Sequence, residues 1–350
     1  MSVLSQRWSR LRSLPHVSLG AFPTPLERSA HLTDALASEI WIKRDDLTGA
    51  PGQYGGNKVR KLERLLADAL ESRADTIVTT GAAGSHHVLA TTLYGRKLGL
   101  DVHAVMVPQK RTPHVESTLR ASIAAGAEIH PVPVYVAVAP AMAALLLRLR
   151  AQGRRPYVIG PGGSEAPGVI GYVDAGLELA GQLLEAKGSE PDAIFVALGS
   201  GGTLAGLALG LAAAGVMASV VGVRVLPAGV VRRAWLASRL RTATDVLRSL
   251  DDRFPDVAEL ALDNMILDDA EIGRGYGIPT PSGREAGRLA EDVGGLALDA
   301  TYTEKAFASL VRAARGPRRG RRLLFVHTLS STHPVGSTAP LPPRIARLIG

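Results

Sequence analysis

The sequence predicts an α/β protein built on mostly parallel sheets, and three observations lead to this class. Short apolar segments rich in β-branched residues alternate along the chain with longer segments of helical periodicity. The short segments are continuous apolar runs, which is typical of strands buried on both faces of a parallel sheet. Glycine-rich loops follow two of these strands and lead directly into a helix. The length of 350 residues suggests about two domains.

The expected elements follow from the same patterns. Apolar runs predict strands at 74–81, 101–107, 127–134, 192–198, 219–226 and 321–329, and helical periodicity predicts helices at 62–70, 86–100, 115–126 and 202–215. The Gly/Pro-rich segment 160–168 separates the first group of strand–helix units from the second. Residues 333–344 are expected to form an extended loop.

Composition excludes several kinds of site. The chain has no cysteine, so it can form no disulfide, zinc–thiolate site, iron–sulfur cluster or thiol nucleophile, and this fits a cytoplasmic protein. The net charge is +8, and six arginines lie in 312–322, which we interpret as a solvated loop before a strand. The alternative is a nucleic-acid patch, but aromatic residues for base stacking are only 4% of the chain, so we expect no nucleic-acid partner. No apolar run is long enough to span a bilayer, so we expect no membrane partner.

A lysine stands at an unusual place in the stretch GGNKVRKLERLLADAL, residues 55–70. An amphipathic helix follows, yet its first turn carries Lys58, Arg60 and Lys61 at the positive end of the helix dipole. Two glycines and an asparagine before Lys58 allow a sharp bend. A partly desolvated lysine near a helix N-terminus favours the neutral amine, which can form a Schiff base with an aldehyde.

The stretch FVALGSGGTLAGLALG, residues 195–210, predicts an anion cradle. An apolar strand runs into 199–203, and backbone N–H groups of this loop, together with the helix N-terminus, can hold a phosphate. The loop lacks the lysine of a Walker motif, and Leu204 breaks the dinucleotide-binding spacing, so an isolated phosphate is favoured. The alternative is a tight turn that needs glycine for packing.

A second loop, TTGAAGSHHVLA at 79–90, predicts a carboxylate site. Ser85 is expected to cap the following helix, and Ser85, His86 and His87 stand where a carboxylate could dock. No further ligands at metal-binding spacing are evident, so we expect no metal. The alternative is a capping serine beside two surface histidines. Taken with Lys58 and the phosphate cradle, this loop points to pyridoxal phosphate, an aldehyde cofactor with one phosphate.

A series of motifs along nearly the whole chain resembles the D-cysteine desulfhydrase / 1-aminocyclopropane-1-carboxylate deaminase family of pyridoxal phosphate enzymes. The motifs are LGAFPTPLE (19–27), IWIKRDDLTG (40–49), GGNKVRKLE (55–63), GSHH (84–87), GSGGTLAGL (199–207), GYGIPTP (275–281), DATYTEKAFASL (299–310) and LLFVHT (323–328). The resemblance implies fold type II (tryptophan synthase β-like), with two open twisted, mostly parallel sheets flanked by helices. It also implies a large cofactor-binding domain (1–61 plus 171–350), a small α/β domain (62–170) and a homodimer.

The resemblance implies roles for particular residues. Lys58 would form the Schiff base and later move the α proton, and Ser85, His86 and His87 would receive the substrate carboxylate. Tyr276 and Tyr302 would line the substrate side as candidate acid–base groups. The catalytic set is thus Lys58, Ser85, Tyr276 and Tyr302. The cofactor-binding set comprises Asn57, Lys58, His86, Gly199, Ser200, Gly201, Gly202, Thr203, Thr303 and Thr328.

The activity implied is α,β-elimination of a cysteine-like amino acid to pyruvate, ammonia and sulfide. Thr303 stands where the desulfhydrase branch has threonine and the deaminase branch an acid, which favours the desulfhydrase. Ring opening of the cyclopropane substrate and β-replacement are alternatives.

The chain departs from the family pattern at three places. His86 stands where the family has Asn, Leu329–Ser331 stand in place of two glycines, and Glu304 and Ala300 replace Gly and Pro. These departures suggest a changed substrate. They also motivate a non-enzyme alternative, a homologue that binds the cofactor or an amino acid with impaired catalysis.

Overall fold

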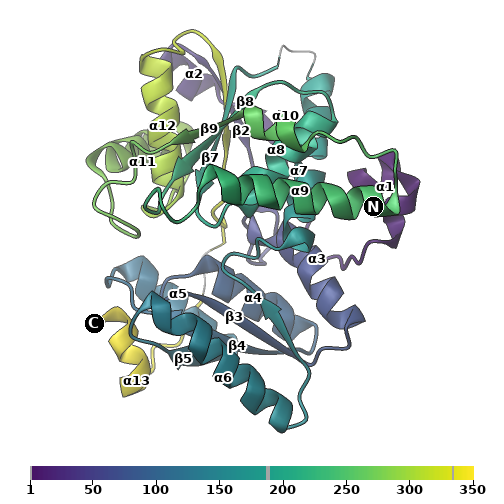
Figure 1. Ribbon diagram of the computed structural model, residues 1–350. Coiled ribbons are helices and arrows are strands. Elements are labelled where there is room, and N and C mark those ends of the chain that lie inside the picture. Colours follow the sequence, from purple (N-terminus) through teal and green to yellow (C-terminus); the bar gives the residue numbers. More distant parts are fainter. Residues whose placement is uncertain (1, 187–189, 333–334) are drawn as a thin grey trace.

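Two sheets organise the chain, and in the computed structural model they lie in two lobes (Figure 1). The structure describes residues 2–186, 190–332 and 335–350. Among these, the larger sheet has six strands in the order β1-β2-β10-β7-β8-β9, and the smaller has four in the order β5-β4-β3-β6. Neighbouring strands are parallel except for the β1–β2 pair. The predicted class, an α/β protein with two mostly parallel sheets, is confirmed.

The strands are short and mostly buried. Those of the larger sheet are Leu26–Arg28 (β1), Glu39–Lys43 (β2), Ala193–Leu198 (β7), Ser219–Arg224 (β8), Met265–Asp268 (β9) and Arg322–Val326 (β10). Those of the smaller sheet are Thr76–Ala82 (β3), Asp101–Val107 (β4), Ala127–Pro131 (β5) and Pro156–Ile159 (β6).

Helices cover both faces of each sheet (Figure 1). They are Val3–Arg7 (α1), Ala30–Leu36 (α2), Lys58–Glu71 (α3), His86–Lys97 (α4), Pro113–Ala124 (α5), Val138–Ala151 (α6), Ala166–Glu185 (α7), Gly202–Ala213 (α8), Arg233–Leu250 (α9), Ala258–Asp263 (α10), Pro281–Gly294 (α11), Thr303–Arg315 (α12) and Pro343–Ala346 (α13). None of the helices in the described ranges is long and apolar enough to cross a membrane.

The buried residues divide along the sheets. One face of the larger sheet packs against α1 and α7–α10, and the other against α2, α11 and α12. The helices α7 and α8 approach closely because Gly206 and Gly210 face the α7 backbone, where a Cβ atom would lie 2.3 and 2.2 Å from carbonyl oxygens. In the smaller sheet, α3, α4 and α5 cover one face and α6 the other. The C-terminal Leu348 and Ile349 return to this lobe and pack beside α5.

Each predicted strand and helix is present, with ends that shift by a few residues. The prediction of a loop over 312–322 is partly wrong, because Arg312 and Arg315 belong to the last turns of α12 and Arg322 begins β10. Arg312 forms ion pairs with Asp268 and Glu271, and these pairs link the end of α12 to the segment around β9. Of the loop expected at 333–344, residues 333–334 lie outside the described ranges, the segment 335–342 has no regular structure, and 343–344 begin α13.

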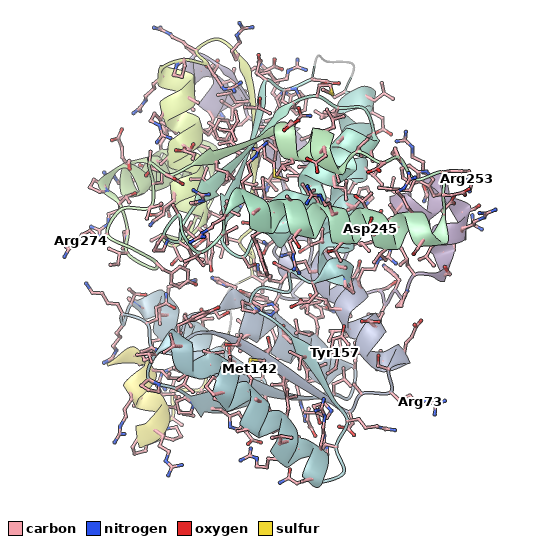
Figure 2. The ribbon with its side chains drawn as sticks, viewed as in Figure 1. Arg73, Met142, Tyr157, Asp245, Arg253 and Arg274 are labelled. Atoms are coloured by element: carbon pink, nitrogen blue, oxygen red, sulfur yellow. The ribbon has the colours of Figure 1, made fainter. Side chains whose placement is uncertain are left out.

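The excess of positive charge is spread over the surface. Figure 2 shows Arg73, Arg253 and Arg274 at three separate places on the outline of the molecule, and all three are exposed. Arg253 is paired with Asp251 at 2.7 Å.

Candidate functional site

A cavity of about 700 Å³ opens where loops from both sheets meet, at the carboxyl ends of the parallel strands. It is lined by most of the residues that the sequence singled out, namely Asn57, Lys58, Ser85, His86, His87, Gly199, Ser200, Gly201, Thr203, Tyr276, Tyr302 and Thr328. Gly202 and Thr303 belong to the same loops but do not line the cavity. Segments far apart in the sequence are thus brought to one place.

Lys58 is the first residue of α3 and is half-buried in the cavity wall. The bend before it needs glycine, because Gly56 has a φ of 86° and a Cβ there would lie 2.8 Å from the carbonyl oxygen of Thr328. Burial lowers the pKa of Lys58 to about 8, although Asp299 acts in the opposite direction. One pH unit below its pKa, about a tenth of an amine is neutral. Lys58 is therefore suited to attack a carbonyl carbon near neutral pH.

The loop after β7 contains hydrogen-bonding hydroxyl and N–H groups, and a second lysine, Lys61, which was not predicted as a site residue, lies beside them. The hydroxyl of Ser164 accepts the N–H of Gly202 at 3.1 Å and donates to Ser200 at 2.8 Å. A Cβ at Gly202 would lie 2.6 Å from Ser164 Oγ and 2.9 Å from Lys61 Nζ, so glycine is required here. The Lys61 ammonium lies over the N-terminus of α8 within this cluster.

Lys61 makes this loop, which the sequence predicts to be an anion cradle, chemically suited to a phosphate. Its side chain is 1% exposed and donates to the carbonyl oxygen of Gly162 at 3.0 Å. Burial and the neighbouring Lys58 hold the pKa of Lys61 well below its usual range. A phosphate monoester between Lys61, the hydroxyls and the first N–H groups of α8 would supply the missing negative charge. The signal in the sequence was spacing, since Lys61 follows Lys58 by one helical turn.

Lys61→Met is expected to weaken binding of pyridoxal phosphate by about 10- to 100-fold, because a hydrogen bond to a charged group contributes roughly 1.5–3 kcal/mol. Fluorescence titration of the cofactor-free protein with pyridoxal phosphate measures this. Lys97→Met, at an exposed lysine, is the matched control and is expected to bind normally. Equal affinities of Lys61→Met and the control would contradict the assignment.

The loop after β3 places its three predicted residues differently. Ser85 caps α4 as predicted, and its Oγ accepts the N–H of Val88 at 3.3 Å, which leaves its O–H free to donate. His87 is buried, contacts Thr79 Oγ1 through Nε2 at 3.1 Å, and its Nδ1 has no partner within the described part of the chain. The alternative of two surface histidines is therefore wrong for His87.

His86 is held on both sides of its ring. Its Nδ1 forms a short hydrogen bond with the hydroxyl of Tyr54, and its Nε2 lies 2.8 Å from Nε2 of His114 on α5. Burial lowers the pKa of His86 to about 4, with Asp299 acting against it, so the ring is neutral near pH 7. Tyr54 and His114 are far from His86 in sequence, and no local pattern points to them. With both nitrogens engaged, His86 is a fixed wall of the cavity.

A pair of tyrosines lies opposite these loops. The hydroxyls of Tyr276 and Tyr302 are 2.7 Å apart, and the rings meet edge to face. Burial raises the pKa of Tyr276 to about 12 and holds the pKa of Tyr302 well above its usual range. Both phenols are thus protonated near neutral pH, which suits them to donate a proton rather than to remove one.

Asp299 and Thr303 form the turn that positions Tyr302. The Asp299 carboxylate accepts the N–H groups of Thr301, Tyr302 and Thr303 at 3.0–3.1 Å and the Thr303 hydroxyl at 2.8 Å. Thr303 therefore points to Asp299 instead of into the cavity, which Asp299 itself lines. Sequence analysis missed Asp299 as a cavity residue.

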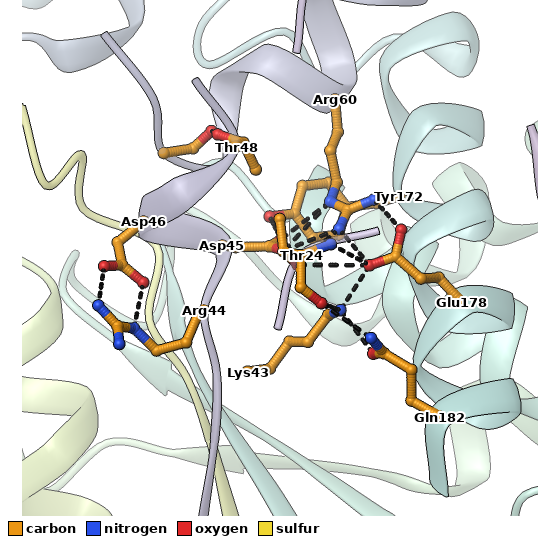
Figure 3. Close-up of polar contacts among 11 residues, drawn as sticks. Thr24, Lys43, Arg44, Asp45, Asp46, Thr48, Arg60, Tyr172, Glu178 and Gln182 are labelled. Atoms are coloured by element: carbon orange, nitrogen blue, oxygen red, sulfur yellow. Dashed lines mark hydrogen bonds and ion pairs between the residues drawn. The ribbon is translucent and has the colours of Figure 1, made fainter. Parts of the chain in front are cut away.

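A buried cluster of charges holds the start of α3 (Figure 3). Arg60 donates to Asp45 at 2.9 Å and to Glu178 at 2.8 Å, and Lys43 donates to the same Glu178 carboxylate at 2.5 Å. Tyr172 adds a hydrogen bond to Asp45 at 2.6 Å. Burial raises the pKa of Asp45 and of Glu178, but Arg60 and Lys43 more than offset this and leave both pKa values lowered. Arg60 lies two residues after Lys58, so the cluster fixes the lysine's helix turn.

The chain is similar to several known proteins. Residues 17–328 match the model of the family "Pyridoxal-phosphate dependent enzyme". The chain is 36% identical over 335 residues to a D-cysteine desulfhydrase of Klebsiella pneumoniae and 37% identical over 333 residues to one of Salmonella newport, and each match covers 91% of this chain and 94% of the relative. A crystal structure of an ACC deaminase homologue superposes with a TM-score of 0.80 at 32% identity, over 93% of this chain and 95% of that chain. The processed form of threonine deaminase isoform 2 from Solanum lycopersicum shares the fold, with a TM-score of 0.59 at 17% identity over 99% of this chain and 88% of that one.

Proposed function

Since this chain belongs to the pyridoxal-phosphate dependent enzymes, we propose that it is a lyase that eliminates sulfide from D-cysteine. D-cysteine and water would give pyruvate, ammonia and hydrogen sulfide. The observation that carries the proposal is the meeting of three parts in one cavity: Lys58 with its lowered pKa, the cradle at 199–203 with Lys61, and the Tyr276–Tyr302 pair. The identity of 36–37% to D-cysteine desulfhydrases supports the choice of substrate.

We assign a different step of this reaction to each group of cavity residues. Bound pyridoxal phosphate supplies a sink for the negative charge that develops at the α carbon of an amino acid. Lys58, once the substrate amine has taken its place, is a neutral amine that can accept the α proton. Ser85 and the N-terminus of α4 can hold the substrate carboxylate through N–H and O–H donors.

The Tyr276–Tyr302 pair is proposed to protonate the departing sulfur. The raised pKa values keep both hydroxyls protonated, and the hydrogen bond between them lets one phenol stabilise the other as the proton leaves. The neutral, doubly held His86 closes the wall beside Lys58 without adding charge.

Turnover of D-cysteine tests the proposal. The purified protein with pyridoxal phosphate is expected to release pyruvate and sulfide in equal amounts from D-cysteine, and more slowly from L-cysteine. Release of 2-oxobutyrate from 1-aminocyclopropane-1-carboxylate, without turnover of D-cysteine, would instead favour the ring-opening alternative, which the structural match to the ACC deaminase homologue motivates. No keto acid from any of these substrates would contradict a lyase and favour a binding protein.

The homodimer and the cytoplasmic location expected from the sequence are parts of the same proposal. The homodimer is carried over from the family resemblance and the cytoplasmic location from the absence of cysteine, and sedimentation distinguishes a dimer from a monomer of 36.7 kDa.

A further inference from the structure

Three metal-ligating side chains meet at the edge of the smaller sheet, and none of them lines the cavity described above. His103 lies on β4, and Glu128 and His130 lie on the edge strand β5. The register pairs His103 with Glu128 and Val105 with His130. Laterally paired residues of parallel strands project to the same face, so all three side chains stand on the face that α6 covers.

The three ligand groups are close together. His103 Nδ1 lies 3.0 Å from His130 Nε2, and each of these nitrogens lies 3.5 Å from an oxygen of Glu128. The two imidazole rings are stacked, with centroids 5.3 Å apart and planes inclined by 13°. Backbone hydrogen bonds between β4 and β5 fix the two histidines relative to each other.

These distances match the edges of a metal coordination shell. Two ligands about 2.0–2.1 Å from a zinc ion at a tetrahedral angle lie roughly 3.3–3.4 Å apart. The two nitrogens are 3.0 Å apart, and each lies 3.5 Å from a different oxygen of Glu128, so an ion can enter with small side-chain adjustments. Two imidazoles and one carboxylate suit zinc and its late first-row neighbours, and they do not suit calcium or magnesium, which prefer oxygen ligands.

The surroundings give the site an entrance and room for a fourth ligand. The His103 side chain is 10% exposed and the Glu128 side chain 59%, so an ion could reach the buried histidine past the outer carboxylate. A cavity of about 300 Å³ beside His103 and Glu128 can hold a water ligand. Arg148 lies 3.7 Å from Glu128 but is 54% exposed and can turn into solvent.

We propose that His103, Glu128 and His130 form a site for one divalent zinc-like ion, with a fourth position open to water. Bound there, the ion would join the edge strand β5 to β4 and stabilise the smaller lobe. The expectation of no metal rested on the loop at 79–90 alone. Glu128 and His130 share β5, and only the register of the sheet brings His103 beside them. The proposal is independent of the proposed lyase activity.

Titration with Co²⁺ tests the site, since bound Co²⁺ absorbs visible light more strongly at four-coordinate than at six-coordinate sites. Protein without a histidine tag, loaded with pyridoxal phosphate, is expected to bind one Co²⁺ per chain with such a spectrum, and Zn²⁺ is expected to displace it. Loss of an outer-sphere partner weakens metal binding roughly 10- to 100-fold, and these side chains are direct ligands. His130→Gln and Glu128→Gln are therefore expected to weaken Co²⁺ binding by at least that factor. His31→Gln, at an exposed histidine on α2, is the matched control and is expected to bind like wild type.

Two results would overturn the proposal. One is the absence of saturable Co²⁺ absorption in the wild-type protein. The other is equal Co²⁺ affinity in wild type, His130→Gln and Glu128→Gln, which would place the ion elsewhere in the protein. In that case, a change of the cofactor absorption on metal addition would locate the ion in the cavity. Glu128→Gln changes an exposed side chain, so its result does not depend on whether the histidine variant folds. Circular dichroism of each variant checks the fold.

Discussion

The Lys58→Ala variant should lose the absorption band of the lysine-bound cofactor and release pyruvate from D-cysteine at least roughly 10²- to 10⁴-fold more slowly than wild type. The reason is that Lys58 is the cavity lysine whose lowered pKa supplies a neutral amine, first to bind the aldehyde and then to move the α proton. Alanine keeps the helix start and removes both functions. Spectra and pyruvate release, measured on the same preparation, check the two effects together.

One control variant and the cofactor content of Lys58→Ala separate chemistry from binding. Lys97→Ala removes an exposed lysine outside the cavity and is expected to behave like wild type. Lys58→Ala keeps Lys61 and the cradle, so it is expected to retain pyridoxal phosphate as the free aldehyde. A Lys58→Ala enzyme with the wild-type band and rate would contradict the role of this residue.

Arg60→Met is expected to destabilise the protein by about 3–5 kcal/mol, the cost of removing one partner from a buried ion pair. The guanidinium contacts two carboxylates, and its loss would leave Asp45 and Glu178 with Lys43 as their remaining cation in the cluster of Figure 3. The midpoint of urea unfolding measures the loss. Arg253→Met is the control, since this arginine is 60% exposed and pairs with one carboxylate, that of Asp251, and a smaller loss of stability is expected.

The same cluster is expected to make the protein less stable as the pH falls. The folded-state pKa values of Asp45 and Glu178 are lowered, so their contribution is fully present above the ordinary carboxyl pKa range and is lost as the pH falls through the folded values. Arg60→Met should therefore flatten the loss of stability on acidification. Equal unfolding midpoints for Arg60→Met and Arg253→Met would contradict this account of the cluster.

Local patterns predicted the parts of the site that depend on a few consecutive residues. The glycine bend before Lys58, the loop at 199–203 and the cap at Ser85 each lie at a strand end or helix start, where turn and capping rules act over short distances. The position of these loops at the carboxyl ends of parallel strands followed from the fold class. Local patterns could also have predicted Lys61 as a site residue, because it lies one helical turn after Lys58.

The remaining contacts depend on which distant segments the fold brings together. The two ring nitrogens of His86 contact Tyr54 and His114, and no spacing in the sequence predicts these contacts. The prediction of Thr303 as a cofactor-binding residue came from the family resemblance, and it did not include the carboxylate of Asp299, which accepts the Thr303 hydroxyl in a local turn. The charge cluster likewise joins residues from the end of β2 and the turn after it, from α3 and from α7, and only the packed structure shows that its charges balance.

Mass-spectrometric mapping of the cofactor after borohydride reduction tests the central claim most directly. Reduction fixes pyridoxal phosphate to the lysine that holds it, and digestion identifies the peptide. We expect the modification at Lys58, with Lys61 unmodified although it is also buried with a lowered pKa. Modification at Lys61, or no modified lysine after saturation with the cofactor, would contradict it.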